Sequence, residues 1–221
     1  MARARTVLLA LLVVAALAAP AAARAPPRPA CGVCTDALDE AAATHGVTVE
    51  RAHSTLDVEA AANGTSTWTA RVRLERGADA LRANDTLRAA VVADARRWTV
   101  VDSPRALASR VDGDTLVVTY RAPNTSHVSL GVVRFDAFRA EDPHSLLPVA
   151  GGEGTVYPGA DRLVLRAPDG YRVHGAYGDR SNASAVVWNG TGSIDRDTVV
   201  SFTRAADPLA GVRAFLVRWL P

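Results

Sequence analysis

The 221-residue sequence has no lysine and no glutamine, and it has only two cysteines, one methionine and one isoleucine. All 25 cationic residues are therefore arginine, a bias that is typical of a GC-rich genome and indicates no function by itself. Aromatic residues make up only 5%, but hydrophobic residues reach 48%, which excludes a disordered chain. No apolar run reaches the roughly 20 residues of a membrane-spanning helix, which excludes a polytopic membrane protein. The length predicts one domain or at most two small ones.

The sequence also lacks the motifs that mark common catalytic and nucleotide-binding sites. It contains no Gly-x-Ser-x-Gly, no His-Glu-x-x-His, no phosphate-binding loop and no dinucleotide fingerprint. We therefore expect no catalytic residue, no cofactor and no metal site, and a hydrolase with a site assembled from distant residues is a weaker alternative. The five histidines are dispersed and lie in no motif; they are His45, His53, His127, His144 and His174.

Residues 1–23 have the pattern of a secretory signal peptide. Arg3 and Arg5 give a basic start, Val7–Ala19 form an unbroken apolar run of 13 residues, and small residues follow up to Ala23. Such a run is typical of signal peptides and too short for the roughly 20 residues that span a bilayer. We expect cleavage after Ala23, and an uncleaved N-terminal anchor is the alternative.

Cleavage would also change the charge of the chain. The formal net charge of +2 includes Arg3 and Arg5, so the mature chain would carry no net charge. The pI of about 8.8 therefore gives no reason to expect nucleic acid as a partner, and no cluster of cations stands out in the remaining sequence. We predict a protein that is secreted or lies at the extracellular face of the cell envelope. Its cell-surface or envelope partner and its oligomeric state are open.

The asparagines indicate export independently of the signal peptide. Each of them begins an Asn-x-Ser/Thr triplet whose middle residue is not proline, the acceptor pattern for N-glycosylation. Serine and threonine make up only 28 of the 221 residues, so this result is far from chance, although asparagine, serine and threonine also share turns. We predict glycosylation at Asn63, Asn84, Asn124, Asn182 and Asn189.

The two cysteines form a Cys31-Gly32-Val33-Cys34 pair at the end of a proline-rich linker, residues 24–34. In an exported protein a lone pair predicts a disulfide. A bridge over two residues closes a small loop and stabilises a fold little, so thiol–disulfide exchange is an alternative. A thioredoxin-like motif, however, follows a buried strand, and here a linker precedes the pair. Metal binding and an intermolecular bridge are weaker alternatives.

Residues 35–221 read as a single β-rich extracytoplasmic domain, with the aperiodic segment 139–154 as a place where it could divide. The fold class that we predict is mainly β (α+β), an antiparallel β-sandwich-like ectodomain with one or two helices in its N-terminal half. A helix is expected over about Thr35–His45, and Arg76–Arg97 also reads as helical. Asn63-Gly64 and Pro168-Asp169-Gly170 are hairpin signals.

The segments between these signals alternate apolar and polar residues with a period of two, which predicts half-buried strands. Trp68, Trp98 and Trp188 are expected to pack in the core or along strands. The expected strands lie over about 47–60, Ser66–Leu74, Trp98–Val101, Leu107–Val111, Thr115–Arg121, Val128–Phe138, Arg162–Arg166, Tyr171–Tyr177, Ala183–Trp188 and Thr198–Thr203.

The C-terminal stretch Leu209–Pro221 is apolar but short, and it carries Arg213 and Arg218. We expect a last strand or helix that packs on the core. The alternative is contact with a membrane surface, with Trp219 and the two arginines at the interface.

Several short motifs resemble a group of haloarchaeal exported proteins that have no assigned function. They include Ala30–Cys34 after the signal peptide, His53–Val58, Asn63–Thr69 and Gly159–Leu163, and with Ala167–Gly170 they are spread over most of the mature chain. The resemblance implies a membrane-tethered ectodomain with a C-terminal transmembrane helix, and it implies no catalytic residue. In this chain we expect no such helix.

These observations predict a secreted or cell-envelope glycoprotein ectodomain, a non-catalytic binding or structural module of unknown ligand. The alternative is an extracytoplasmic thiol–disulfide redox protein that uses the Cys31/Cys34 pair.

Overall fold

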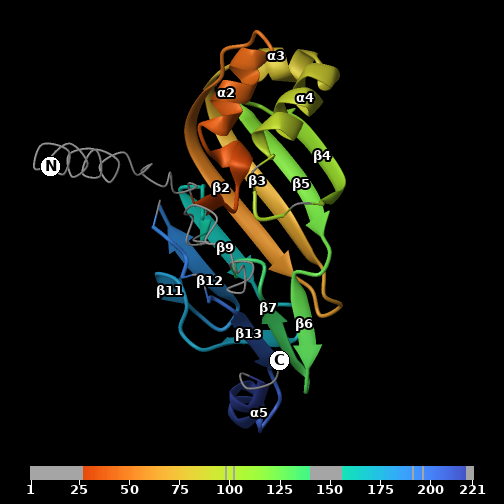
Figure 1. Ribbon diagram of the computed structural model, residues 1–221, viewed down its shortest axis with the longest axis vertical. Helices are drawn as coiled ribbons and strands as arrows, with labels where there is room; N and C mark the ends of the chain where they lie inside the picture. The colour runs from red at the N-terminus through yellow and green to blue at the C-terminus, as the bar shows by residue number, and fades with distance from the viewer. Residues whose placement is uncertain are drawn as a thin grey trace, which may run out of the picture. The chain divides into compact units, whose positions relative to one another are not determined.

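The largest element of the fold is a seven-stranded sheet (Figure 1). The computed structural model describes residues 27–139 and 156–217, apart from residues 98, 102, 191 and 196. The seven strands are β2 (Glu50–Ala60), β3 (Ser66–Arg76), β4 (Arg105–Asp112), β5 (Thr115–Ala122), β9 (Arg162–Arg166), β11 (Arg180–Ser181) and β12 (Ala185–Asn189). Their order across the sheet is β11-β12-β9-β2-β3-β5-β4. All neighbours are antiparallel except β2 and β9, which are parallel.

A second, antiparallel sheet has four short strands in the order β10-β13-β7-β6. They are β6 (Ser126–Ser129), β7 (Val132–Phe135), β10 (Tyr171–His174) and β13 (Val200–Arg204). A parallel pair of two-residue strands, β1 (Arg28–Pro29) and β8 (Val156–Tyr157), joins the first described residues to the segment that leads into β9.

The helices lie at the two ends of this arrangement. Figure 1 shows α2 (Ala37–Thr44), α3 (Ala78–Ala83) and α4 (Asp85–Ala95) together at one end and α5 (Ala210–Val217) at the other. A short 3₁₀ turn, η1 (Gly32–Cys34), precedes α2. The helical stretch expected over Arg76–Arg97 is divided at Asn84, whose extended backbone ends α3 and whose side chain caps α4.

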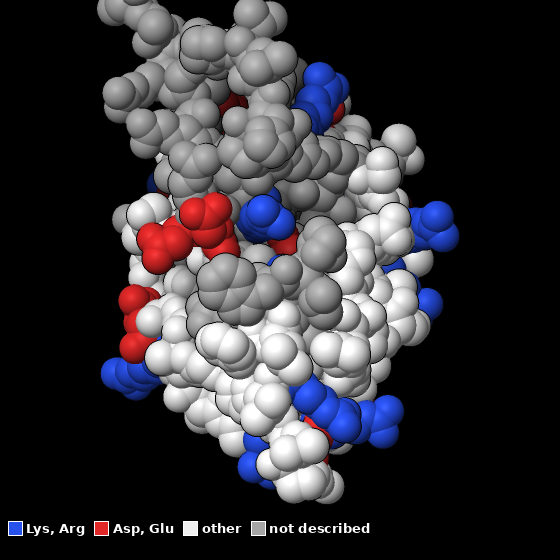
Figure 2. Space-filling model, turned by 60° about the horizontal axis from the view of Figure 1, so that its bottom comes forward, with Lys and Arg blue, Asp and Glu red and all other residues white. Residues whose placement is uncertain are grey.

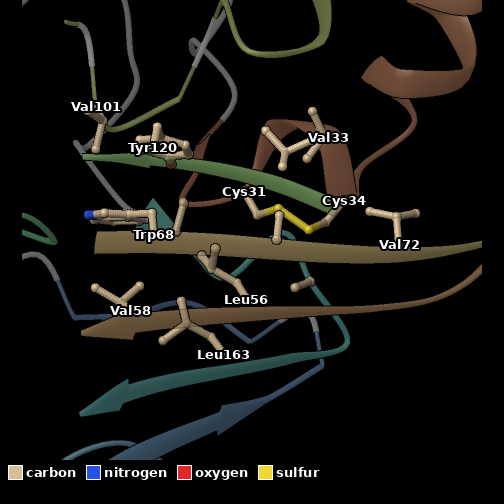
Figure 3. Close-up of a cluster of buried hydrophobic side chains, with 14 of the residues drawn as sticks. Cys31, Val33, Cys34, Leu56, Val58, Trp68, Val72, Val101, Tyr120 and Leu163 are labelled. Carbon is tan, nitrogen blue, oxygen red and sulfur yellow. A yellow bond between two sulfur atoms is a disulfide. The ribbon is translucent and has the colours of Figure 1, made fainter. Parts of the chain in front are cut away.

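One face of the large sheet carries the hydrophobic core. Along β3 the predicted alternation is confirmed, because Trp68, Ala70, Val72 and Leu74 are all buried. Helices cover one half of this face and the small sheet covers the other, so a single core extends under both. Figure 3 shows part of this core, in which the Cys31–Cys34 disulfide lies between Trp68 and Val72.

The predicted fold class is confirmed, since the described chain is mainly β and its sheets are mostly antiparallel. Three predicted elements differ in detail. The strand expected over Val128–Phe138 is two strands, because Leu130 and Gly131 both have positive φ and reverse the chain. The Pro168–Gly170 turn does not form a hairpin, since β9 pairs with β2 and β12 whereas β10 pairs with β13. Residues 99–101 belong to no strand.

Trp68 and Trp188 are buried in the core, as predicted. The predicted signal peptide, Trp98, His144, nearly all of the segment 139–154 and Trp219 lie outside the described residues. Among the helices that the structure describes, none has the length and apolar character of a membrane span.

Candidate functional site

All five predicted glycan acceptors are exposed. Each lies in a turn, between two elements or at the end of a strand, where the chain leaves the packed layers. Asn63 is in the β2–β3 turn, Asn84 joins α3 to α4, Asn124 is in the β5–β6 turn, Asn182 lies between β11 and β12, and Asn189 is the last residue of β12. A glycan at any of these positions would extend into solvent and displace no core residue.

Three of these asparagines also stabilise the local backbone. The side-chain oxygens of Asn63, Asn84 and Asn182 each accept a hydrogen bond from a backbone N–H two or three residues further along the chain, over 2.8 to 3.1 Å. These bonds explain why asparagine suits the turns. They use Oδ1 and not Nδ2, the atom to which an N-linked sugar attaches, so the structural role and glycosylation are compatible.

The serine or threonine at the third position of each triplet is less uniformly exposed than the asparagine. Thr86 and Ser184, which belong to the Asn84 and Asn182 triplets, are exposed, and Thr65 is half-buried. Ser126, of the Asn124 triplet, is buried, and its hydroxyl donates to the carbonyl of Ala61 at 3.4 Å. A transferase acting on the folded chain would therefore reach the first two triplets more readily than the Asn124 triplet.

The predicted Cys31–Cys34 disulfide is present. The two Cα atoms are 5.3 Å apart, and the bridge spans η1. Both residues are buried, with 3% and 2% of their surface exposed, and they belong to the main core (Figure 3). An attacking thiolate needs access to a sulfur atom, so this burial favours a structural disulfide over an exchanging one.

Arg51 of β2 fixes this turn to α2. Its guanidinium donates to the carbonyl of Cys34 at 2.5 Å and to Oδ2 of Asp39 at 3.0 Å, and it also pairs with Asp36. The two carboxylates lie in the first turn or cap of α2, where negative charge also interacts favourably with the helix dipole. One half-buried cation therefore joins the disulfide turn, the start of a helix and the central sheet.

Two glycines allow other segments to approach the turn closely. A Cβ atom at Gly32 would lie 2.3 Å from the carbonyl oxygen of Ala95 in α4. A Cβ atom at Gly159 would lie 2.7 Å from the carbonyl oxygen of Cys31, and Gly159 has a φ of +71°. Both positions therefore require glycine, one for space and the other for space and conformation.

A cleft of about 370 Å³ lies beside the turn. His53 and Ser54 of β2 and Asp161, just before β9, line part of it. Oδ2 of Asp161 accepts hydrogen bonds from the backbone N–H of Ser54 at 2.7 Å and from its hydroxyl at 3.0 Å, and lies 3.2 Å from Nδ1 of His53. Desolvation opposes ionisation of Asp161, but the Ser54 hydrogen bonds and the His53 charge outweigh it and lower the pKa of the carboxyl.

The three residue types match a hydrolase triad, but their arrangement does not. In a triad the serine bonds to the imidazole, which the carboxylate orients. Here the Ser54 hydroxyl is bonded to Asp161, and among the described residues no hydrogen bond joins it to His53. The arrangement instead ties two neighbouring parallel strands together, because Ser54 lies in β2 and Asp161 directly precedes β9.

Sequence reasoning did not bring these residues together because Asp161 lies 107 residues from Ser54, and the motifs that contain them, His53–Val58 and Gly159–Leu163, have no catalytic spacing. Two other histidines also pair with carboxylates, His45 with Asp94 at 2.9 Å and His127 with Asp136 at 3.2 Å. Within the described ranges, no group of three or more His, Cys, Asp or Glu side chains is arranged to hold a metal ion.

Comparison with known proteins gives no family. No protein-family model matches the chain, and no curated protein sequence matches it.

Proposed function

We propose that this chain is a secreted or cell-envelope glycoprotein ectodomain that acts as a non-catalytic binding or structural module. The observation that carries the proposal is the exposure of all five asparagines that begin acceptor triplets. A buried disulfide supports it, since disulfides form and persist in oxidising, extracytoplasmic compartments. A rigid β-rich frame with sugars on its turns is suited to display at a cell surface.

The test is to isolate the protein from its own cells and measure its intact mass, its N-terminus and the modification of each acceptor peptide. Enzymatic glycan removal in heavy-oxygen water would mark each occupied asparagine as aspartate. We expect an N-terminus at Arg24 and sugar at several of the five positions. A chain that retains Met1–Ala23 and carries no sugar at any of them would contradict the proposal.

The alternative is a thiol–disulfide redox protein. The Cys31–Cys34 pair and the adjacent cleft are the observations in its favour, whereas the burial of both cysteines argues against it. Insulin reduction by the wild type and by Cys34→Ser separates the two. Activity that disappears in Cys34→Ser would establish exchange, and an inactive wild type would remove this alternative.

We also propose that the α5 end contacts a membrane surface. Leu209, Val212, Phe215 and Leu216 each expose 49–60% of their surface, and Ala214 is the one buried residue among residues 210–216 of this helix, whose side chains the structure describes. Leu130, at the tip of the β6–β7 hairpin, is 53% exposed beside Gly131, which faces Arg213 of α5. Figure 2 brings this end forward and shows uncharged surface bordered by both cationic and acidic side chains, and the exposed apolar residues suit the apolar part of a membrane interface.

A further inference from the structure

The face of the seven-stranded sheet that points away from the core is rich in arginine. Strand residues alternate between faces, so cations that are scattered along the sequence gather on one side when the strands pair. Eight exposed arginines lie on this face, against four carboxylates, Asp57, Glu59, Glu75 and Asp112. No described helix or strand covers it.

Two of the eight arginines are paired within the face, both with the single carboxylate of Asp57. Asp57 accepts from Arg71 at 2.8 Å and from Arg166 at 3.1 Å. The side chains of the other six form no hydrogen bond or ion pair with any residue in the described part of the chain, and we call these six residues the arginine face. They are Arg73, Arg105, Arg110, Arg121, Arg162 and Arg180.

The register places arginines in rows across the strands. One row runs Arg162, Thr55, Arg71, Val117 and Arg110 over β9, β2, β3, β5 and β4. Arginine therefore occurs on alternate strands, about 10 Å apart given the spacing between strands. A β-branched residue, Thr55 or Val117, separates the neighbouring arginines of this row.

The next row is Val164, Asp57, Thr69, Thr119 and Ala108, which carries no arginine, and the row beyond it is Arg166, Glu59, Thr67, Arg121 and Arg105. Guanidinium groups bind carboxylates and sulfates through two parallel hydrogen bonds. Threonine hydroxyls between the arginines can exchange hydrogen bonds with sugar hydroxyls. The two arginine rows, with the threonines of the row between them, place several cationic sites for anions on a hydroxyl-bearing surface.

The side chains between the arginines indicate which polyanion fits. Val117 and Val164 of this face are buried, and no aromatic residue lies on it. It therefore lacks both the stacking platform of single-stranded nucleic-acid sites and the apolar side chains that enter a bilayer. We infer that the arginine face binds an acidic polysaccharide, an extended sugar polymer with carboxylate or sulfate groups at intervals of about two sugars. This inference rests on the proposed function, because the protein would meet such a polysaccharide at the cell envelope.

The test measures binding of the purified, folded chain to immobilised alginate and dextran sulfate, with neutral dextran as the blank. We compare wild type with Arg110→Gln/Arg121→Gln/Arg162→Gln, which removes three unpaired cations from the face. The matched control, Arg139→Gln/Arg172→Gln/Arg204→Gln, removes the same charge from exposed positions elsewhere. Circular dichroism checks that both variants fold.

We expect the wild type to bind both acidic polymers with an affinity that falls as salt rises, and not to bind dextran. The face variant should bind about tenfold more weakly or worse, and the control variant within about twofold of wild type. Equal losses in both variants, or binding to neutral dextran, would overturn the inference. Tighter binding to anionic phospholipid vesicles or duplex DNA than to the polysaccharides would also overturn it. Because the assay uses the purified chain, it measures binding by the arginine face independently of whether the protein is exported or glycosylated.

Discussion

At the scale of single residues, the acceptor triplets distinguish two times at which sugar could be attached. Asn84 and Asn182 are exposed together with their hydroxyl residues, whereas Asn124 is exposed and Ser126 is buried. If the transferase acts after folding, we expect high occupancy at Asn84 and Asn182 and little at Asn124. Peptide mass spectrometry of the exported protein measures these occupancies. Equal occupancy at all three would show that attachment precedes folding.

Gly159 tests how closely the disulfide turn packs. In Gly159→Ala the new methyl group would meet the Cys31 carbonyl oxygen at 2.7 Å. Gly170→Ala is the matched control, because Gly170 has a similar φ of +78° but no atom within 4 Å of the added Cβ. Both variants lose the left-handed freedom of glycine, and only the first also overpacks. We expect Gly159→Ala to lower the free energy of unfolding by about 1–3 kcal/mol more than Gly170→Ala does, as measured in urea.

Asp161 gives the fold a defined pH dependence. Its pKa is lowered in the folded state, so the unfolded chain takes up its proton first as the pH falls. The stability that Asp161 contributes is therefore present above about pH 4, the unfolded value, and is lost as the pH falls through the folded pKa. Its side chain is 54% exposed, so water screens the interaction and the contribution is about 1 kcal/mol.

Asp161→Asn should therefore destabilise the protein at pH 7. Between pH 5 and 3, the range around the ordinary pKa of a carboxyl group, the variant should lose less stability than wild type. Urea unfolding at several pH values checks this. Asp169→Asn, at an exposed turn, is the control. If the free energy of unfolding of Asp161→Asn fell as steeply with decreasing pH as that of wild type, Asp161 would not be the source of the pH dependence.

At the scale of elements, α5 stands out among the described helices because its large apolar side chains Val212, Phe215 and Leu216 face solvent. We expect the full chain to bind vesicles that contain anionic phospholipid, and Val212→Ser/Phe215→Ser to bind about tenfold more weakly, because apolar area no longer enters the interface. Leu107→Ser is the control, since Leu107 is 42% exposed on the distant edge strand β4. Vesicle co-sedimentation measures both. Equal binding of both variants would exclude α5 as the contact.

Elements with a strong local pattern could be predicted from the sequence, and elements fixed by pairing between distant segments could not. The alternation of Trp68 to Leu74 and the Asn63-Gly64 signal correctly predict the β2–β3 hairpin. The Leu130-Gly131 reversal escaped prediction because leucine rarely adopts a positive φ. Turn chemistry correctly placed a turn at Pro168–Gly170, but the hairpin predicted from it does not form, because turn chemistry does not determine which strands pair. The same limit applies to the site, since the exposed asparagines follow from turn signals and the Ser54–Asp161 cluster does not.

At the scale of the whole molecule, the glycan acceptors and the arginine face divide the surface between them. The acceptors lie in turns and at strand ends, so sugars there would surround the large sheet and leave its centre open. Asn189 stands beside Arg162 in the register and so marks one border of the arginine face. A module arranged in this way can carry several glycans and still present a flat charged surface to a polymer.

Phe138 tests whether the two sheets fold as one unit. It follows β7, is fully buried, and its ring centroid lies 5.9 Å from Trp68, 5.1 Å from Phe135 and 5.5 Å from Trp188. Trp68 and Trp188 belong to the large sheet and Phe135 to the small one, so Phe138 contacts both. Removing its ring leaves a cavity between the sheets, and we expect Phe138→Ala to cost about 3–5 kcal/mol.

Because one continuous core lies under both sheets and the helices, that loss should move the whole unfolding transition. We expect the urea unfolding transitions measured by tryptophan fluorescence and by far-UV circular dichroism to shift together to lower urea concentration. The two curves should remain superimposable. Val128→Ala, at an exposed position of the small sheet, should change the free energy of unfolding by no more than about 0.5 kcal/mol with either probe. If the fluorescence transition moved while part of the ellipticity kept its original midpoint, the sheets would unfold separately. In that case the arginine face could persist on the large sheet after the α5 end had unfolded.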